Sequence, residues 1–277
     1  MTVVPPPELR FRRRVRVRQA AVELWRAREL VATLAERELR TRYKQAVLGF
    51  AWALIPPVGL MLVFTFFVRH VGHVSTQGTP YQLYAYLGLL PWTFFTASVM
   101  NGGVSLVVNV PLLNKVYCPR EVFPIASVAA ATFDGLISTL VLLVLFPLNS
   151  RAPQPTTYWV PLLLAIQLLF TLGVVLLVAG VVVYLRDVRH LLPIALQLGL
   201  FITPVAYSLH SVPRHLRGLY VAANPLGAVI DGYRRCVLLG RAPDLHLVAV
   251  AGVSSTCLFV LAFWAFKRLE TGVADVA

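Results

Sequence analysis

The chain has 277 residues, of which 58% are hydrophobic and only 13% are charged. A soluble domain carries about 25% charged residues, so the composition argues against a water-soluble enzyme and indicates a membrane protein. The formal net charge of +13 is concentrated at the N-terminus, where 12 of the 25 lysines and arginines precede Val47. This distribution favours membrane orientation and contact with anionic lipid over nucleic-acid binding.

The N-terminal region is predicted to contain a basic disordered tail over residues 1–22 and an amphipathic helix over residues 23–45. One side of this helix carries the apolar residues Leu24, Val31, Leu34 and Ala35. Two stabilising i, i+4 ion pairs are expected on it, Glu36 with Arg40 and Glu38 with Arg42. A helix of this kind lies in the membrane surface.

Six segments are apolar over the length of about 20 residues that a bilayer requires. They are 46–68, 83–110, 122–148, 158–185, 191–209 and 247–266. Each is expected to be helical, because lipid offers no partners to free backbone groups. The sequence therefore predicts an all-α membrane protein with one transmembrane domain over residues 23–277. Asp134 is the one acid inside a predicted span, and a structural hydrogen bond or a pore-facing position is favoured for it over catalysis.

Lysine and arginine set the predicted orientation. With the N-terminus inside, the inner segments hold 18 of the 25 cations and the outer segments hold 7. The positive-inside rule then places both termini in the cytoplasm.

The segment 210–246 is too polar to span and contains five of the outer arginines. It is predicted to form two short helices, the first after Ser211 and the second after Asn224 as N-cap, where Pro225 occupies the first turn. One face of the second helix carries Leu226, Val229, Ile230, Tyr233 and Val237, and Gly240 can end it. Re-entrant helices in the outer leaflet and an ordinary outer helical hairpin both fit this pattern.

No motif for catalysis or metal binding is found. A phosphate-binding loop needs Gly-Lys followed by Ser or Thr, but none of the lysines at positions 44, 115 and 267 follows a glycine. Any ATP-driven function therefore needs a separate subunit, and the chain itself is expected to be no enzyme. The acids are too scattered to hold the magnesium and diphosphate of a lipid-linked sugar transferase, and the three cysteines form no motif.

Five stretches of the sequence follow one another in the order and spacing of a known family. They are Arg42-Tyr-Lys-Gln-Ala-Val-Leu-Gly-Phe-Ala-Trp, Gly88-Leu-Leu-Pro-Trp-Thr-Phe-Phe, Leu113-Asn-Lys-Val-Tyr-Cys-Pro-Arg, Leu185-Arg-Asp-Val-Arg-His with Gln197-Leu-Gly-Leu-Phe-Ile-Thr-Pro-Val, and Asn224-Pro-Leu. From about Glu29 to Arg268 the chain resembles the permease subunit of the type 2 ABC exporters for polysaccharides, which move O-antigens, teichoic acids and related polymers on polyprenyl-diphosphate lipids.

The resemblance implies six spans, an N-terminal interface helix and outer re-entrant helices in the bacterial inner membrane. It implies a homodimer with two ABC ATPase subunits, which would bind ATP and magnesium, while this chain holds no cofactor. It gives residues 111–121 the role of a coupling helix that contacts the ATPase, with a shorter inner loop beside it. The residues expected at this contact are Asn114, Lys115, Val116, Tyr117, Arg120, Arg186, Asp187 and Arg189.

Two further sites are expected. Arg40, Arg42, Tyr43 and Lys44 lie where the interface helix meets the first span and are expected to bind the diphosphate of the lipid head, because arginine pairs with phosphate through two parallel hydrogen bonds. Plain anchoring to anionic lipid remains the alternative. A channel at the dimer interface would be lined from the first and fifth spans by Trp52, Phe64, Phe201 and Tyr207. The competing interpretations, a secondary transporter or a membrane enzyme of lipid-linked sugar assembly, would need no separate ATPase.

Overall fold

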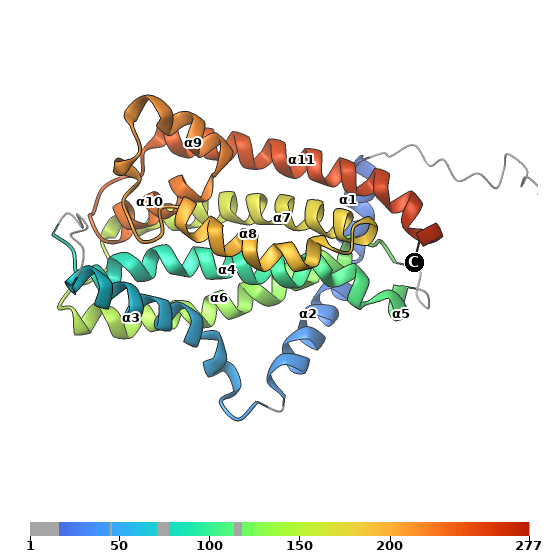
Figure 1. The fold of residues 1–277 in the computed structure, drawn as a ribbon, viewed down its shortest axis with the longest axis horizontal. Coiled ribbons are helices and arrows are strands. Elements are labelled where there is room, and N and C mark those ends of the chain that lie inside the picture. Colours follow the sequence, from blue (N-terminus) through green and yellow to red (C-terminus); the bar gives the residue numbers. More distant parts are fainter. Residues whose placement is uncertain (1–16, 45, 71–77, 114–117, 277) are drawn as a thin grey trace, which may run out of the picture.

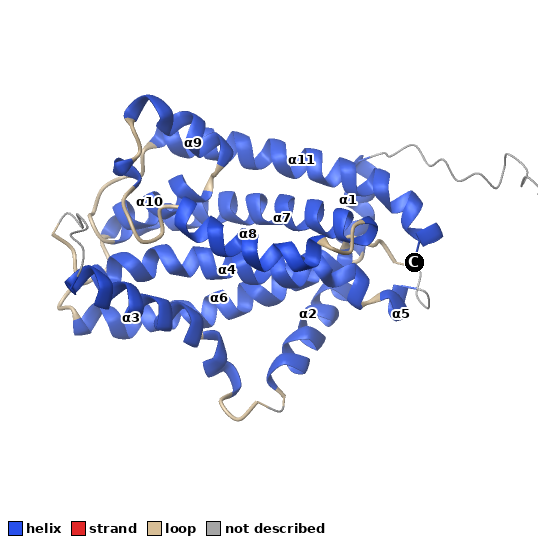
Figure 2. Ribbon diagram, viewed as in Figure 1, coloured by secondary structure: helices blue, strands red, loops and turns tan. Residues whose placement is uncertain are grey.

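The computed structural model describes residues 17–44, 46–70, 78–113 and 118–276. These residues fold into a bundle of helices that run roughly side by side (Figures 1 and 2). In chain order the α-helices are α1 (Val17–Arg26), α2 (Arg28–Tyr43), α3 (Ile55–His70), α4 (Tyr81–Val108), α5 (Val110–Leu113), α6 (Val122–Leu148), α7 (Val160–Tyr184), α8 (Val188–Ile202), α9 (Arg217–Ala223), α10 (Leu226–Val237) and α11 (Leu245–Val276). Helix α4 is the central element, because α3, α6, α7, α8 and α10 all pack against it.

The bundle has two ends, which are named here after the helices that close them. The α2 end carries α1, α2, α5 and the last turns of α11, and the α10 end carries α9 and α10 (Figure 1). Helices α2 and α3 diverge from the bundle and are joined by a protruding segment that contains the 3₁₀ helix η2 (Gly49–Ala53).

Four helical stretches in the described part of the chain are long and apolar enough to cross a bilayer. They are Tyr81–Val108, Val122–Leu148, Pro155–Tyr184 (the 3₁₀ helix η3, Pro155–Trp159, followed by α7) and Leu245–Leu269. Helices α3 and α8 are apolar but shorter, with 16 and 15 residues. Four of the six predicted spans therefore meet the length criterion, and the six-span topology stays a prediction.

The expectation that residues 46–68 and 191–209 are helical throughout is wrong at one end of each segment. The first segment begins with turns and η2, and Gly49 has a φ of +51°, a left-handed backbone that interrupts an α-helix. The other segment ends its helix at Ile202, because Thr203 precedes Pro204 and adopts an extended conformation with ψ of 140°. A proline disfavours helical geometry in the residue before it.

The N-terminal helices confirm the predicted amphipathic pattern. Leu34 and Ala35 are buried in a second apolar core at the α2 end, together with side chains of α4, α6, α7 and α11, and Leu24 and Val31 pack against it. Helix α1 begins at Val17, so the last residues of the predicted tail, 17–22, are helical rather than disordered. Residues 1–16 lie outside the described part of the chain.

The predicted helix after Asn224 is confirmed as α10, and its five predicted apolar residues are all buried. Gly240 has a φ of +65° just beyond its end. The prediction that the side chain of Asn224 caps α10 is wrong, because its Nδ2 donates instead to Oγ1 of Thr203 at 2.9 Å. The first predicted helix of this segment consists of two 3₁₀ turns, η4 (Leu209–Ser211) and η5 (Arg214–Leu216), followed by α9.

Candidate functional site

The last turn of α2 is joined to the middle of α6 by a polar cluster. Arg42 Nη1 contacts Asp134 Oδ2, and Arg42 Nη2 donates to Glu38 Oε1 at 2.8 Å. One turn earlier on α2, the other oxygen of Glu38 accepts a hydrogen bond from Ser127 Oγ at 2.8 Å. The predicted structural hydrogen bond of Asp134 and the predicted pair of Glu38 with Arg42 are thus confirmed.

Tyr43 completes this cluster. Its hydroxyl donates to Asp134 Oδ1 at 2.8 Å, so both oxygens of that carboxylate have partners. Burial, and then the hydrogen bond to Asp134, raise the pKa of Tyr43 to about 12. The phenol therefore stays protonated and can act only as the donor in this contact. Its ring packs on Phe50 with centroids 4.8 Å apart, and Phe50 meets Phe133 of α6 edge-on.

The two other predicted diphosphate-binding cations have different surroundings. Arg40 pairs with Glu36 at 2.6 Å as predicted, but its side chain is 74% exposed, and Lys44 at the end of α2 is also exposed. An exposed pair of this kind contributes about 0–1 kcal/mol, so Arg40 can leave Glu36 at little cost. Arg42, at 28% exposure, is held by two carboxylates.

The predicted coupling segment, 111–121, is anchored at both of its described ends. Just before it, Asn109 accepts a 2.7 Å hydrogen bond from Arg37 Nη2 of α2. At its far end, fully buried Glu121 forms a 2.7 Å ion pair with Lys267 of α11. Arg120 is half-buried. The predicted contact residues Asn114, Lys115, Val116 and Tyr117 lie outside the described residues.

The shorter loop between α7 and α8 lies at the same end of the bundle. Arg186, Asp187 and Arg189 are all exposed there, as a docking surface requires, and Asp187 stands at the N-terminus of α8. The ring of His190 accepts a 3.1 Å hydrogen bond from Arg189 Nε. Both predicted contact regions are thus attached to the α2 end.

The four predicted channel residues do not form one cluster. Trp52 and Phe201 are exposed on different elements, η2 and α8. Phe64 is partly buried against the main core through α3, and Tyr207 lies beyond α8, where its hydroxyl donates to the carbonyl of Ile202 at 2.6 Å. Within one copy of the chain, therefore, these side chains line no common cavity.

A second cluster, which the sequence pattern did not predict, lies at the α10 end and is centred on Arg234. This side chain is only 2% exposed and has its guanidinium 3.7 Å from the centroid of the Tyr84 ring. Nε donates to the Tyr84 carbonyl at 3.1 Å, and Nη1 donates to the Pro204 and Tyr207 carbonyls at 2.8 and 2.9 Å. Nη2 donates to the Val205 carbonyl. Three of these four carbonyls belong to the non-helical segment that follows α8, so Arg234 supplies hydrogen-bond donors to that segment.

Three of the family-like stretches meet around this arginine. Gly88 lies against it, and a Cβ atom at this position would come within 2.6 Å of the Val205 carbonyl oxygen. Thr203 and Asn224, from two other stretches, are joined by the hydrogen bond described above. No local sequence pattern marks Arg234 itself.

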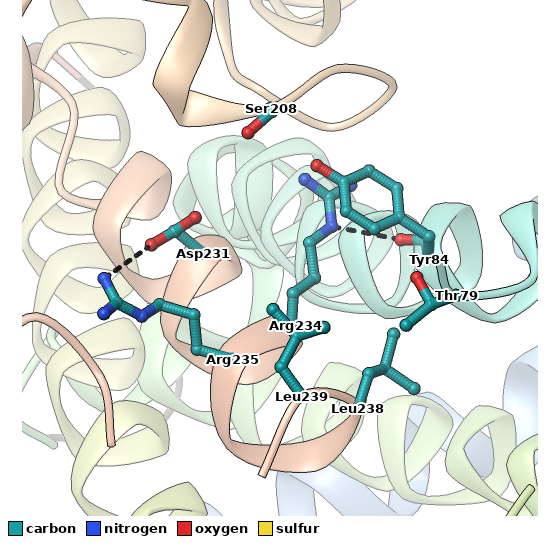
Figure 3. Close-up of a pocket in the computed structure, with 8 residues that line it drawn as sticks. All are labelled: Thr79, Tyr84, Ser208, Asp231, Arg234, Arg235, Leu238 and Leu239. Carbon is teal, nitrogen blue, oxygen red and sulfur yellow. Dashed lines mark hydrogen bonds and ion pairs between the residues drawn. The ribbon is translucent and has the colours of Figure 1, made fainter. Parts of the chain in front are cut away.

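A small pocket opens beside this cluster. Figure 3 shows Arg234 pointing toward Tyr84, whereas the neighbouring Arg235 points toward Asp231. Arg235 Nη1 lies 3.8 Å from Asp231 and 3.9 Å from Asp244, which are loose ion pairs. The pocket is lined by Thr79, Tyr84, Ser208, Asp231, Arg234, Arg235, Leu238 and Leu239. Among the described residues no three His, Cys, Asp or Glu side chains gather to hold a metal ion.

Known proteins match this chain over most of its length. The family described as "ABC-2 type transporter" matches residues 29–238. The O-antigen export system permease protein RfbA of Myxococcus xanthus is 32% identical over 239 residues, covering 86% of this chain and 91% of that protein. RfbA of Klebsiella pneumoniae is 23% identical, and the match covers 90% of this chain and 95% of that protein. The polysialic acid transport protein KpsM of Escherichia coli is 28% identical, and the match covers 76% of this chain and 81% of that protein. The chain therefore belongs to the ABC-2 type transporter family.

Proposed function

We propose that this chain is the membrane permease of an ATP-driven exporter, which moves a polysaccharide on a polyprenyl-diphosphate lipid across the bacterial inner membrane. The observation that carries this proposal is the match to permeases of O-antigen and polysialic acid transport over at least three quarters of the chain. The four long apolar helices support residence in a membrane, and hydrolysis of ATP by a separate subunit is consistent with the lack of a phosphate-binding loop in the sequence.

In this proposal the α2 end faces the cytoplasm, and two copies of the chain assemble with two ABC ATPase subunits. Helices α3 and α8 form the first and fifth of six spans and line the channel between the two copies. This is supported by the continuous apolar stripes that they leave uncovered: Ile55, Leu62 and Phe66 on α3, and Leu191, Ile194, Leu198 and Phe201 on α8. The re-entrant interpretation of α9 and α10 belongs to the same proposal.

The ATPase would contact residues 111–121 and the loop at Arg186–Arg189. Closure of the ATPase on ATP would push the coupling segment, and the anchors of that segment on α2 and α11 would pass the movement to the spans. The lipid diphosphate would be received by Arg40, Arg42, Tyr43 and Lys44 where α2 and α3 diverge, which is supported by the exposure of Arg40 and Lys44.

Depletion of the protein tests the proposal directly. Lipid extracts of depleted cells should accumulate a polymer linked to polyprenyl diphosphate, and the same polymer should disappear from the cell surface. Mass spectrometry of that lipid would identify the polymer as an O-antigen, a teichoic acid or another polysaccharide. Unchanged lipid extracts together with unchanged surface polymer would contradict the function.

The need for an ATPase separates this function from its alternatives. The purified chain should not hydrolyse ATP, and hydrolysis should appear when the partner subunit is added. A secondary transporter would carry its substrate without that partner, and a membrane enzyme would turn over substrate in its absence.

A further inference from the structure

The guanidinium of Arg42 is one of the polar attachments between α2 and α6. Both of its terminal nitrogens contact carboxylates, one on Asp134 and one on Glu38. Because two carboxylates surround one guanidinium, the cluster of Arg42, Asp134 and Glu38 carries a net negative charge. As described, this cluster therefore offers no free positive charge to a lipid diphosphate, although Arg42 was predicted to bind it.

Arg42 is nevertheless within reach of a ligand. Its side chain is 28% exposed, whereas that of Asp134 is 14% exposed. The cluster lies at the end of α2, next in sequence to the exposed Lys44. Because Arg42 is the more exposed of the two side chains, a ligand can reach its guanidinium more readily than the carboxylate of Asp134.

Phosphate and carboxylate compete for the same donors, because both accept the two parallel N–H groups of an arginine. A diphosphate carries more charge than Asp134 and would repel the carboxylate, so Arg42 cannot easily hold both. Asp134 would not be stranded when Arg42 leaves, since the Tyr43 hydroxyl continues to donate to it. Arg42 can therefore change from Asp134 to the diphosphate without leaving Asp134 unpaired.

We propose that Asp134 and the diphosphate of the lipid substrate compete for Arg42, so that substrate binding removes this ion pair and loosens the attachment of α2 to α6. The inference rests on the proposed function and extends it. In the empty state Arg42 on Asp134 holds α2 in place. When the diphosphate takes Arg42, α2 loses this ion pair, while Tyr43 still donates to Asp134 and Arg37 still binds Asn109, next to the predicted coupling segment. Arrival of substrate would thereby loosen a helix that also adjoins the region proposed to contact the ATPase.

The test is whether variants of Arg42 and Asp134 tighten or weaken binding of the lipid diphosphate. The full-length chain is placed in nanodiscs of neutral phosphatidylcholine, and binding of undecaprenyl diphosphate is measured. Asp134→Asn should tighten binding about tenfold, because it removes the competitor, and Arg42→Met should weaken it about tenfold. Tyr43→Phe should also weaken binding, because Asp134 then depends more on Arg42. Arg28→Met and Glu29→Gln, on α2 but away from α6, serve as matched controls and should bind like the unmodified chain.

A static ion pair between Arg42 and Asp134 predicts a different result. If Arg42 and Asp134 only hold the helices together, Asp134→Asn and Arg42→Met should both weaken binding or both leave it unchanged, and either result overturns the exchange. Repeating the measurement with phosphatidylglycerol as the probe separates the two sources of phosphate. An equal effect of Asp134→Asn on phosphatidylglycerol would show that bulk anionic lipid competes for Arg42, and would overturn the specific exchange. If the unmodified chain binds no undecaprenyl diphosphate at all, the proposed substrate fails and the exchange fails with it.

Discussion

At the scale of single residues, Arg234 and Glu121 are both covered by protein but are stabilised in different ways. Arg234 donates to four backbone carbonyls and lies over an aromatic ring, whereas Glu121 is paired with Lys267. A charge that loses its partners inside a protein costs several kcal/mol. Each of these residues therefore fixes the segments that it joins, the end of α8 in one case and the coupling segment in the other.

The Arg234 cluster gives a stability prediction. Arg234→Lys keeps the charge but loses the planar fork that reaches carbonyls on two sides, so it should destabilise the protein by about 3 kcal/mol. Arg235→Lys is the matched control, because this neighbouring arginine makes only loose ion pairs. Thermal unfolding of the detergent-purified chain measures both variants, and equal melting temperatures for the two would refute the anchoring role of Arg234.

At the scale of elements, α2 is attached to its neighbours at three places along its length. Arg37 binds Asn109, Glu38 binds Ser127, and Arg42 contacts Asp134. The first of these adjoins the coupling segment and the last lies at the middle of α6. Because α2 is a single helix between the Arg37 and Arg42 attachments, a movement at one of them displaces the other.

Charge reversal in the coupling segment tests the contact with the ATPase. Lys115→Glu combined with Arg120→Glu should strongly reduce export while the chain still accumulates in the membrane, because a loop contributes little to the packing of the spans. Export is measured as surface polymer at equal membrane abundance. The matched control is Arg214→Glu combined with Arg241→Glu at the α10 end, which should retain ATPase binding. Normal export by the first double variant would remove the coupling role.

At the scale of the whole molecule, most large apolar side chains on the surface belong to helices on the outside of the bundle, such as α3, α6, α8 and α11. The central helix α4 is mostly buried. A water-soluble protein does not expose so many apolar residues, so a lipid membrane is the surrounding that this surface suits. Polar segments are confined largely to the two ends of the bundle.

Cysteine labelling tests the orientation of the bundle. In a chain whose native cysteines are replaced by serine, a cysteine at Thr76 or Arg217 should react with an impermeant reagent in intact cells, and one at Lys115 should react only after lysis. The 18-to-7 division of cations between inner and outer segments motivates this prediction. Reaction at Lys115 in intact cells would contradict the six-span topology with both termini inside.

The sequence by itself determined the features that depend on neighbours three or four positions apart. The buried faces of α2 and α10 follow from helical periodicity, and the pairs of Glu36 with Arg40 and Glu38 with Arg42 follow from i, i+4 spacing. Composition alone predicted a helical membrane protein. The order and spacing of the five short stretches indicated the transporter family.

Only the tertiary structure decided how distant residues meet. Arg42 and Asp134 are 92 positions apart, and Arg234 and Tyr84 are 150 positions apart, so no local period relates them. The carboxylate of Asp134 could have faced a pore, but the packing of α2 on α6 supplied it with two donors. The carbonyls of the segment that follows α8 could have been paired in several ways, and the approach of α10 to Gly88 placed Arg234 among them. Buried polar groups must find hydrogen-bond partners, but which partners they find depends on how the helices pack.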